Sequence, residues 1–146
     1  MKVLMLCVLL LPSLLMAQTR KIVKAAPVKA TTSANTQTSI QRGQAIYKAH
    51  CLACHQADGG GVGTLNPPFV KQWAGGEKSR IIRMILKGSV GKVEIDGDTF
   101  SNTMPAQPTF NDQQIADVLT YVRKNFGIKA SVVSAAEVKA VRAKAK

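Results

Sequence analysis

The sequence predicts an all-α domain in the middle of the chain. Two segments, 79–87 and 112–126, repeat apolar residues at the spacing of a helix, and a third, 40–50, follows a serine that can begin one. The 146-residue chain is 46% hydrophobic and 19% charged. That balance suits one small globular domain and excludes both an acidic disordered tail and a polytopic membrane protein.

The first 17 residues, MKVLMLCVLLLPSLLMA, are expected to be a cleaved signal peptide. One lysine precedes an apolar run of 13 residues, Val3–Leu15, and the small residue Ala17 stands before polar Gln18. A helix needs roughly 20 apolar residues to cross a bilayer, so an uncleaved membrane anchor is the less favoured alternative. We therefore expect export to the periplasm and a mature chain without Cys7.

The excess of positive charge is concentrated at the two ends of the chain. The whole sequence has 20 basic and 8 acidic residues, a net charge of +12. Segment 18–39 contains four basic and no acidic residues and is predicted to be a flexible basic linker. Segment 128–146, a C-terminal extension, contains five basic residues and one acidic residue. Within it, 134–146 is predicted to form a basic helix capped by Ser134 with Glu137 three residues on. Such tails could contact anionic lipid headgroups weakly or dock on an acidic partner, or they could be solvated ends.

A first helix is predicted from Ile40 to His50, with Ser39 as its cap. Gly43 and Tyr47 lie one turn apart on the same face of this helix. A glycine inside a helix is costly unless another element packs closely against it.

The mature chain retains two cysteines, Cys51 and Cys54, and His55 directly follows the second. This Cys-X-X-Cys-His spacing is typical of covalent c-type haem attachment, in which each thiol adds to one vinyl group and the histidine becomes an axial iron ligand. A thioredoxin-like pair is less favoured because no βαβ pattern surrounds the motif. A zinc site is also less favoured, because it needs about four ligands and the mature chain adds only His50 to these three.

A second helix is predicted over 79–87, followed by a hairpin over 93–100 whose Asp96-Gly97 pair suits a type I′ turn. The last helix is predicted over 112–126. It is bounded by cap residue Asn111, by Gln114 at the third position and by a glycine just past its end.

A six-coordinate iron needs a second axial ligand, and the mature chain offers Met84, Met104 and His50. Met84 lies at the edge of an apolar helical stripe and is more simply a packing residue. His50 immediately precedes the attachment motif and cannot easily reach the opposite face of the haem. Met104 stands in an irregular segment that Pro105 stiffens, so we predict Met104 as the ligand. A methionine–histidine pair raises the reduction potential above that of a bis-histidine pair.

The order of CLACH, the segment Asn66–Phe69 after a glycine-rich loop, NTMPA and the ending YVRKNFG resembles that of class I c-type cytochromes, over residues 40–127. The resemblance implies a small cytochrome c fold of three to five helices around one covalently attached haem c. It implies that the first helix crosses the last at a glycine and an aromatic residue. It also implies that the carbonyl of Pro67 accepts a hydrogen bond from the other ring nitrogen of His55, which orients the imidazole.

Three functions follow from these predictions. The first is a monomeric, mono-haem periplasmic electron carrier that cycles between Fe2+ and Fe3+ and is not an enzyme. The second is an electron-transfer subunit docked to a periplasmic dehydrogenase or reductase. The third is a haem sensor or catalyst with an open sixth position, which requires Met104 to be away from the iron. Redox proteins are the expected partners, and nucleic acid is not expected for an exported chain.

Overall fold

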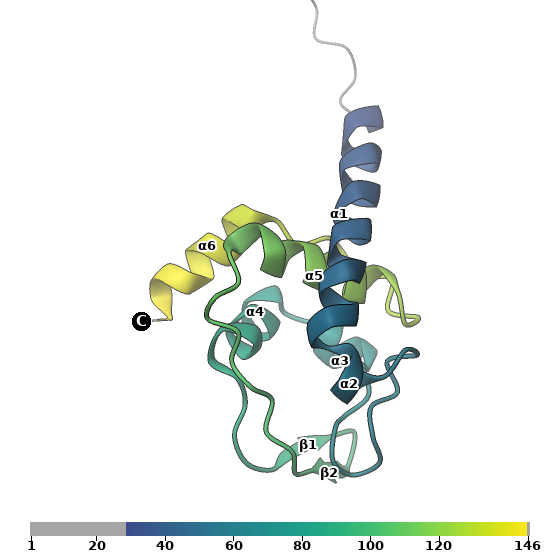
Figure 1. Ribbon diagram of the computed structural model, residues 1–146, viewed down its shortest axis with the longest axis vertical. Helices are drawn as coiled ribbons and strands as arrows, with labels where there is room; N and C mark the ends of the chain where they lie inside the picture. Colours follow the sequence, from purple (N-terminus) through teal and green to yellow (C-terminus); the bar gives the residue numbers. More distant parts are fainter. Residues whose placement is uncertain (1–28, 146) are drawn as a thin grey trace, which may run out of the picture.

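The structure, a computed structural model, describes residues 29–145. The predicted signal peptide and residues 18–28 of the predicted linker lie outside this range. In order, the elements are α1 (Lys29–His50), α2 (Leu52–His55), α3 (Lys71–Ala74), α4 (Lys78–Lys87), β1 (Val93–Ile95), β2 (Asp98–Phe100), α5 (Asp112–Lys124) and α6 (Ala135–Lys144) (Figure 1). The described part is therefore helical apart from one small hairpin, which confirms the predicted all-α class.

The first helix is longer than predicted. It begins at Lys29 rather than at Ile40, so residues 29–39, which the sequence predicts as linker, are helical. No glycine or proline interrupts the chain between these two positions. Ser39 is not a helix cap: its hydroxyl donates a hydrogen bond of 2.6 Å to Asp117 of α5. Ser39 therefore lies inside α1, where its contact with α5 helps to hold the helix in place.

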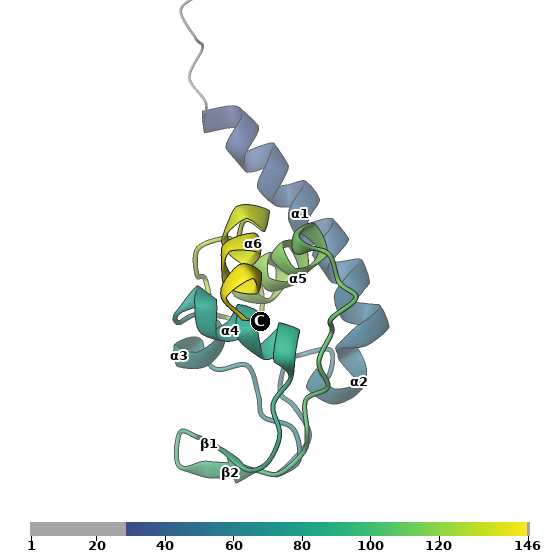
Figure 2. The same cartoon turned by 90° about the vertical axis from the view of Figure 1, so that its left-hand side faces the viewer.

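The crossing of α1 and α5 sets the shape of the domain. A Cβ atom on Gly43 would lie 2.0 Å from the backbone oxygen of Asp117, so only glycine allows this approach. One turn along α1, the Tyr47 and Tyr121 rings have centroids 5.3 Å apart. The close glycine and aromatic contact that the resemblance implies is therefore present. Figure 2 shows α1 beside α5, with the hairpin at the opposite end of the molecule from Lys29.

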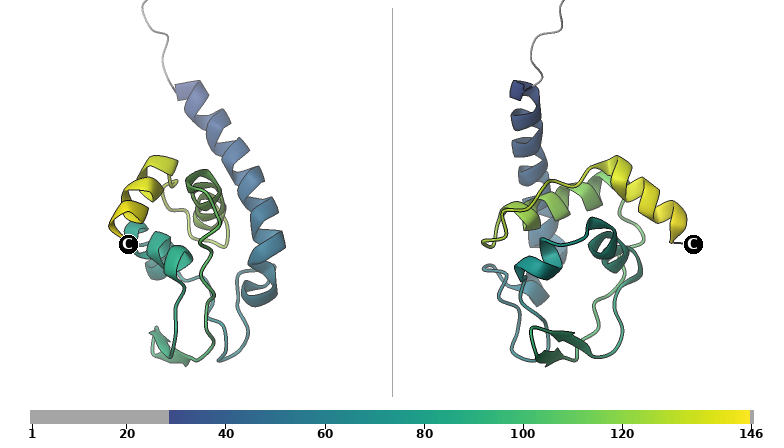
Figure 3. Two further views of the ribbon diagram at one scale, coloured as in Figure 1. Left: turned by 60° about the vertical axis from the view of Figure 1, so that its left-hand side comes forward. Right: turned by 180° about the vertical axis from the view of Figure 1, so that it is seen from behind.

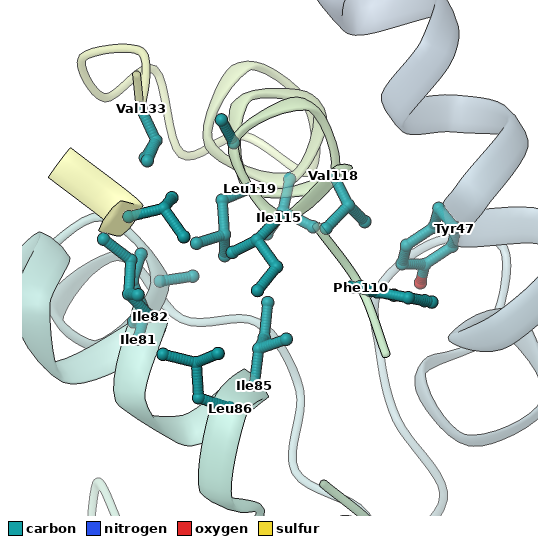
Figure 4. Close-up of a cluster of buried hydrophobic side chains, with 14 of the residues drawn as sticks. Tyr47, Ile81, Ile82, Ile85, Leu86, Phe110, Ile115, Val118, Leu119 and Val133 are labelled. Carbon is teal, nitrogen blue, oxygen red and sulfur yellow. The ribbon is translucent and has the colours of Figure 1, made fainter. Parts of the chain in front are cut away.

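The hydrophobic core lies between α4, α5 and α6. Its buried side chains include Ile81, Ile82, Ile85 and Leu86 from α4, and Ile115, Val118, Leu119 and Val122 from α5 (Figure 4). The C-terminal extension contributes Val133 and the fully buried Val138. In Figure 3, α6 lies beside α5 and over α4. The extension is thus part of the packed domain rather than a free tail.

Local sequence signals set most element boundaries as predicted. Asn111 and Gln114 form a capping box on α5, and Ser134 and Glu137 form one on α6. Asp96 and Gly97 have φ values of 53° and 88°, as a type I′ turn requires.

The structure differs from the prediction in two details of the helices. The last long helix ends at Lys124, two residues before the predicted end, because Phe126 and Gly127 both adopt left-handed backbone conformations. The four-residue helices α2 and α3 are too short to produce a periodic pattern and were not predicted. Among the described residues, no helix has the length and apolar character needed to span a membrane.

Candidate functional site

One cavity collects the predicted ligands from two separate parts of the chain. Cys51, Cys54 and His55 line it from the end of α1 and from α2, and Met104 lines it from the segment after the hairpin. Apolar side chains form most of the remaining wall: Ile81, Met84 and Ile85 from α4, Val118, Leu119 and Val122 from α5, and Val93, Ile95 and Phe100 from the hairpin. No aspartate, glutamate, lysine or arginine of the described chain lines this cavity.

A single turn of chain presents the attachment motif. The Cys51 amide donates to the carbonyl of Tyr47 at 2.8 Å, which continues α1 into the motif. The Cys51 carbonyl then accepts hydrogen bonds from the amides of Cys54 (3.2 Å) and His55 (2.9 Å). The Tyr47 hydroxyl closes the turn by donating to the carbonyl of Gln56 at 2.6 Å. Both thiols and the imidazole therefore leave the same turn.

The two thiols are free and differ in exposure. Cys51 is half-buried and Cys54 is exposed. Burial, together with the neighbouring Cys54, raises the pKa of the Cys51 thiol to about 11. A raised pKa at Cys51 is the opposite of what the nucleophilic thiol of a thioredoxin-like pair needs.

His55 is held by packing and has one ring nitrogen without a partner. Its ring stacks on Phe69, with centroids 4.5 Å apart and planes inclined by 19°. Burial lowers the pKa of His55, and the backbone of Pro67 opposes that shift. Pro67 is therefore near the imidazole, but the buried Nδ1 makes no hydrogen bond of normal geometry within residues 29–145. The predicted hydrogen bond from His55 to Pro67 stays a prediction.

Met104 is fixed by the backbone at the end of α4. Its amide donates to the carbonyl of Ser89 at 3.0 Å, and the Ser89 amide donates to the carbonyl of Met104 at 2.9 Å. Gly88 ends α4 in a left-handed conformation, and a Cβ atom there would lie 2.5 Å from the Met104 oxygen. Ser89 and Gly88 carry no sequence signal for this role, since their partner is more than ten residues away.

The other two candidate ligands also line the cavity. Met84 is half-buried on α4, whereas His50 is exposed and its ring meets the edge of the Phe110 ring at a centroid distance of 5.0 Å. Aromatic packing at Phe69 and Phe110 was not predicted as part of the site, because an isolated phenylalanine in a loop has no periodicity to indicate where it packs.

The donor set fits a covalently attached haem. Two thiols and an imidazole share one turn, a thioether lines the same cavity, and the uncharged wall suits a large apolar macrocycle. By contrast, no three histidine, cysteine, aspartate or glutamate side chains in the described range form a group that could hold a metal ion. The zinc alternative therefore has no support in the structure.

Comparison with known proteins gives the same assignment. Residues 40–125 match the cytochrome c family. The chain is 31% identical over 112 residues to cytochrome c-552 of Thermus thermophilus, a match that covers 70% of this chain and 85% of that protein. It is 36% identical over 121 residues to the fructose dehydrogenase cytochrome subunit of Gluconobacter japonicus, and 33% identical over 107 residues to the gluconate 2-dehydrogenase cytochrome c subunit of Pantoea cypripedii.

The two kinds of relative differ in length. The match to the fructose dehydrogenase subunit covers 76% of this chain, and the match to the gluconate 2-dehydrogenase subunit covers 70% of it. Each match covers only 24% of the dehydrogenase subunit, so the chain spans about a quarter of the length of these two relatives. The family match nevertheless includes the attachment motif, the Met104 segment and the whole of α5. The chain therefore belongs to the cytochrome c family, whose members transfer electrons through covalently attached haem c.

Proposed function

We propose that this protein is a monomeric, mono-haem electron carrier of the periplasm. Cys51 and Cys54 attach the haem, and His55 and Met104 are the axial ligands of its iron. The observation that carries this proposal is that all four side chains line one cavity, and that no Asp, Glu, Lys or Arg among residues 29–145 lines it with them. The haem supplies an iron that accepts and releases one electron.

The residues of the chain set the position and the electronic environment of that iron. Phe69 stacks on His55 and restricts rotation of the imidazole. The backbone of Pro67 acts on the same ring, and we propose that its carbonyl accepts a hydrogen bond from Nδ1 once the imidazole is fixed. Because the wall is uncharged, it favours the less charged, reduced state and so raises the potential, in the same direction as a methionine ligand.

The names of several relatives support a proposal for the route of electrons to and from this protein. Several are cytochrome subunits of dehydrogenases for gluconate, fructose and alcohol. We therefore infer that redox proteins are its partners, and that a dehydrogenase is the second candidate context, with this chain as an associated electron-transfer subunit. Exposed lysines such as Lys139 and Lys144 on α6 could meet an acidic partner surface or, weakly, anionic lipid. Co-purification of the exported protein with a dehydrogenase would favour the second context over a free carrier.

The ligand assignment is tested by optical spectra of the exported protein. We expect sharp c-type reduced bands and the weak long-wavelength ferric band that reports methionine sulfur on iron. Met104→Ala is expected to keep the covalent haem, abolish the sulfur band and let carbon monoxide bind the reduced protein. Met84→Ala is the matched control, because Met84 lines the same cavity and should leave the band in place.

The opposite results would change the assignment. Loss of the band in Met84→Ala with retention in Met104→Ala would move the ligand to α4. A wild-type protein that lacks the band and binds carbon monoxide readily would support a sensor or catalyst with an open sixth position.

A further inference from the structure

The C-terminal helix α6 lies outside the family match, which ends at residue 125. We propose that Arg142 of α6 is a positioning residue of the haem pocket. It holds the backbone of Phe110 and thereby keeps the Met104 segment closed over the sixth coordination position. This inference rests on the proposed function, in which Met104 is an iron ligand.

The guanidinium of Arg142 makes two contacts with the chain that leads into α5. Its Nη2 donates to the carbonyl of Phe110 at 2.6 Å, and its Nε donates to Oδ1 of Asp112 at 2.7 Å. These two partners lie on either side of Asn111, the N-cap of α5. Hydrogen bonds from a charged guanidinium are stronger than neutral ones, and two from one planar group fix direction as well as distance. Arg142 therefore fixes the backbone immediately before α5.

Phe110 connects this anchor with the cavity. Its side chain is 8% exposed, lines the cavity and meets the ring of His50 edge-on. Figure 4 shows Phe110 on the α1 side of the buried cluster and away from the α4 side chains. A shift of the Phe110 backbone would therefore move part of the cavity wall.

The segment 104–110 has no helix or regular strand of its own to keep it in place. Three tethers hold it. Met104 pairs with Ser89, and the Gln107 amide donates to the carbonyl of Ile85 at 2.8 Å, so the first two tethers come from the end of α4 and the residues just after it. Arg142 supplies the third, from the opposite end of the segment.

The position of α6 does not depend on Arg142 alone. Val138 is fully buried, and Lys78 of α4 forms an ion pair of 2.8 Å with Glu137. The hydroxyl of Thr120 accepts the Val133 amide at 3.0 Å just before α6 begins. Replacing Arg142 should therefore release Phe110 while α6 remains docked, and replacing Lys78 removes an α6 contact without touching segment 104–110.

Imidazole is a suitable probe because it binds ferric iron only in molecules whose Met104 has moved away. Its apparent affinity is proportional to the fraction of such open molecules. Loss of a hydrogen bond from a charged group corresponds to a change of about tenfold in that fraction. We expect Arg142→Met to bind imidazole about tenfold more tightly than the wild type, and Arg142→Lys, which keeps the charge and can retain one contact, to fall in between.

Lys78→Met is the matched control for general loosening of α6. We expect it to lower the melting temperature of the holoprotein about as much as Arg142→Met does, with imidazole affinity within twofold of the wild type. An unchanged affinity in Arg142→Met would overturn the inference. So would an equal increase in both variants, because the effect would then come from α6 docking as a whole.

Met104→Ala separates this inference from the proposed function. If Met104→Ala binds imidazole much more tightly and Arg142→Met does not, the role of Arg142 is wrong and the ligand assignment stands. If Met104→Ala binds imidazole no more tightly than the wild type, the ligand assignment is wrong, and the inference about Arg142 fails with it.

Discussion

Ser89 and Met104 exchange two backbone hydrogen bonds, of 2.9 and 3.0 Å, although 15 positions separate them in the sequence. The pair closes the loop over residues 90–103, which contains the hairpin. It also holds the Met104 backbone against the end of α4. A thioether on an unattached loop would lose conformational freedom on binding iron. The pair removes part of that freedom in advance, so it should favour the methionine-ligated state.

Gly88→Ala should disturb this arrangement. Gly88 has φ +73°, and the new Cβ would lie 2.5 Å from the Met104 oxygen. We expect a weaker ferric sulfur band and a loss of about 2 kcal/mol in the free energy of unfolding, from left-handed strain and from the clash together. Gly91→Ala is the control, because Gly91 has φ +89° but no heavy atom of the described chain near its Cβ position. It should lose stability modestly and keep the band. Equal loss of the band in both variants would show that the clash with Met104 is irrelevant.

The parts of the fold that the sequence predicts correctly are those with short-range causes. The caps at Asn111 and Ser134 and the turn at Asp96-Gly97 each depend on residues within three positions of one another. The predicted start of α1 at Ile40 was wrong. Ser39 does not cap the helix; like Arg42, it binds Asp117, more than 70 residues away, a partner that the local sequence does not indicate.

The candidate site also combines features with short-range causes and features with long-range causes. The attachment motif is contiguous, so spacing alone predicts Cys51, Cys54 and His55 as haem-binding residues. Met104 needed an argument by elimination. The contact of Ser89 with Met104 and the contact of Phe110 with His50 join segments whose pairing only the folded chain determines.

Replacing Cys51 and Cys54 together with serine should abolish covalent haem. Each thiol is needed for one thioether bond to the haem, and a serine hydroxyl is too weak a nucleophile to replace it. The measurement is haem staining of the denatured protein after electrophoresis. The single variants should show reduced staining or none, and Cys7→Ser, which lies in the predicted signal peptide, is the control and should stain normally. Full staining of the double variant would be incompatible with attachment at this motif.

Gly43→Ala should destabilise the crossing of α1 and α5. The added methyl group would lie 2.0 Å from the Asp117 backbone oxygen and 2.9 Å from Cβ of Tyr121, so the helices must move apart. In an unpacked helix the same change would stabilise by up to about 1 kcal/mol, whereas here we expect a loss of about 3 kcal/mol. Urea unfolding of the holoprotein gives the value. Gln44→Ala, at an exposed neighbouring position, should have little effect. A Gly43→Ala protein as stable as the wild type would mean that the helices do not approach as closely as described.

Stability below neutral pH should depend on Asp117. Burial acts to raise the pKa of this carboxyl group, but hydrogen bonds from Arg42, Ser39 and Gln113 outweigh burial and lower it. A pKa lowered by folding means that the carboxylate stabilises the folded state at pH values above its unfolded pKa, about 3.9. That stabilisation should be lost as the pH falls through the lower, folded pKa.

Asp117→Asn tests this dependence, since the amide keeps the shape but not the charge. We expect it to be less stable than the wild type by about 2 kcal/mol at pH 7, because hydrogen bonds to a charged acceptor become bonds to a neutral one. The difference should shrink as the pH falls below about 4, because the wild-type carboxylate then becomes protonated and resembles the amide. Urea unfolding of both holoproteins at a series of pH values measures it. A difference that stays constant down to the acid limit would show that the charge of Asp117 contributes nothing, and that packing at Gly43 and between Tyr47 and Tyr121 holds α1 against α5.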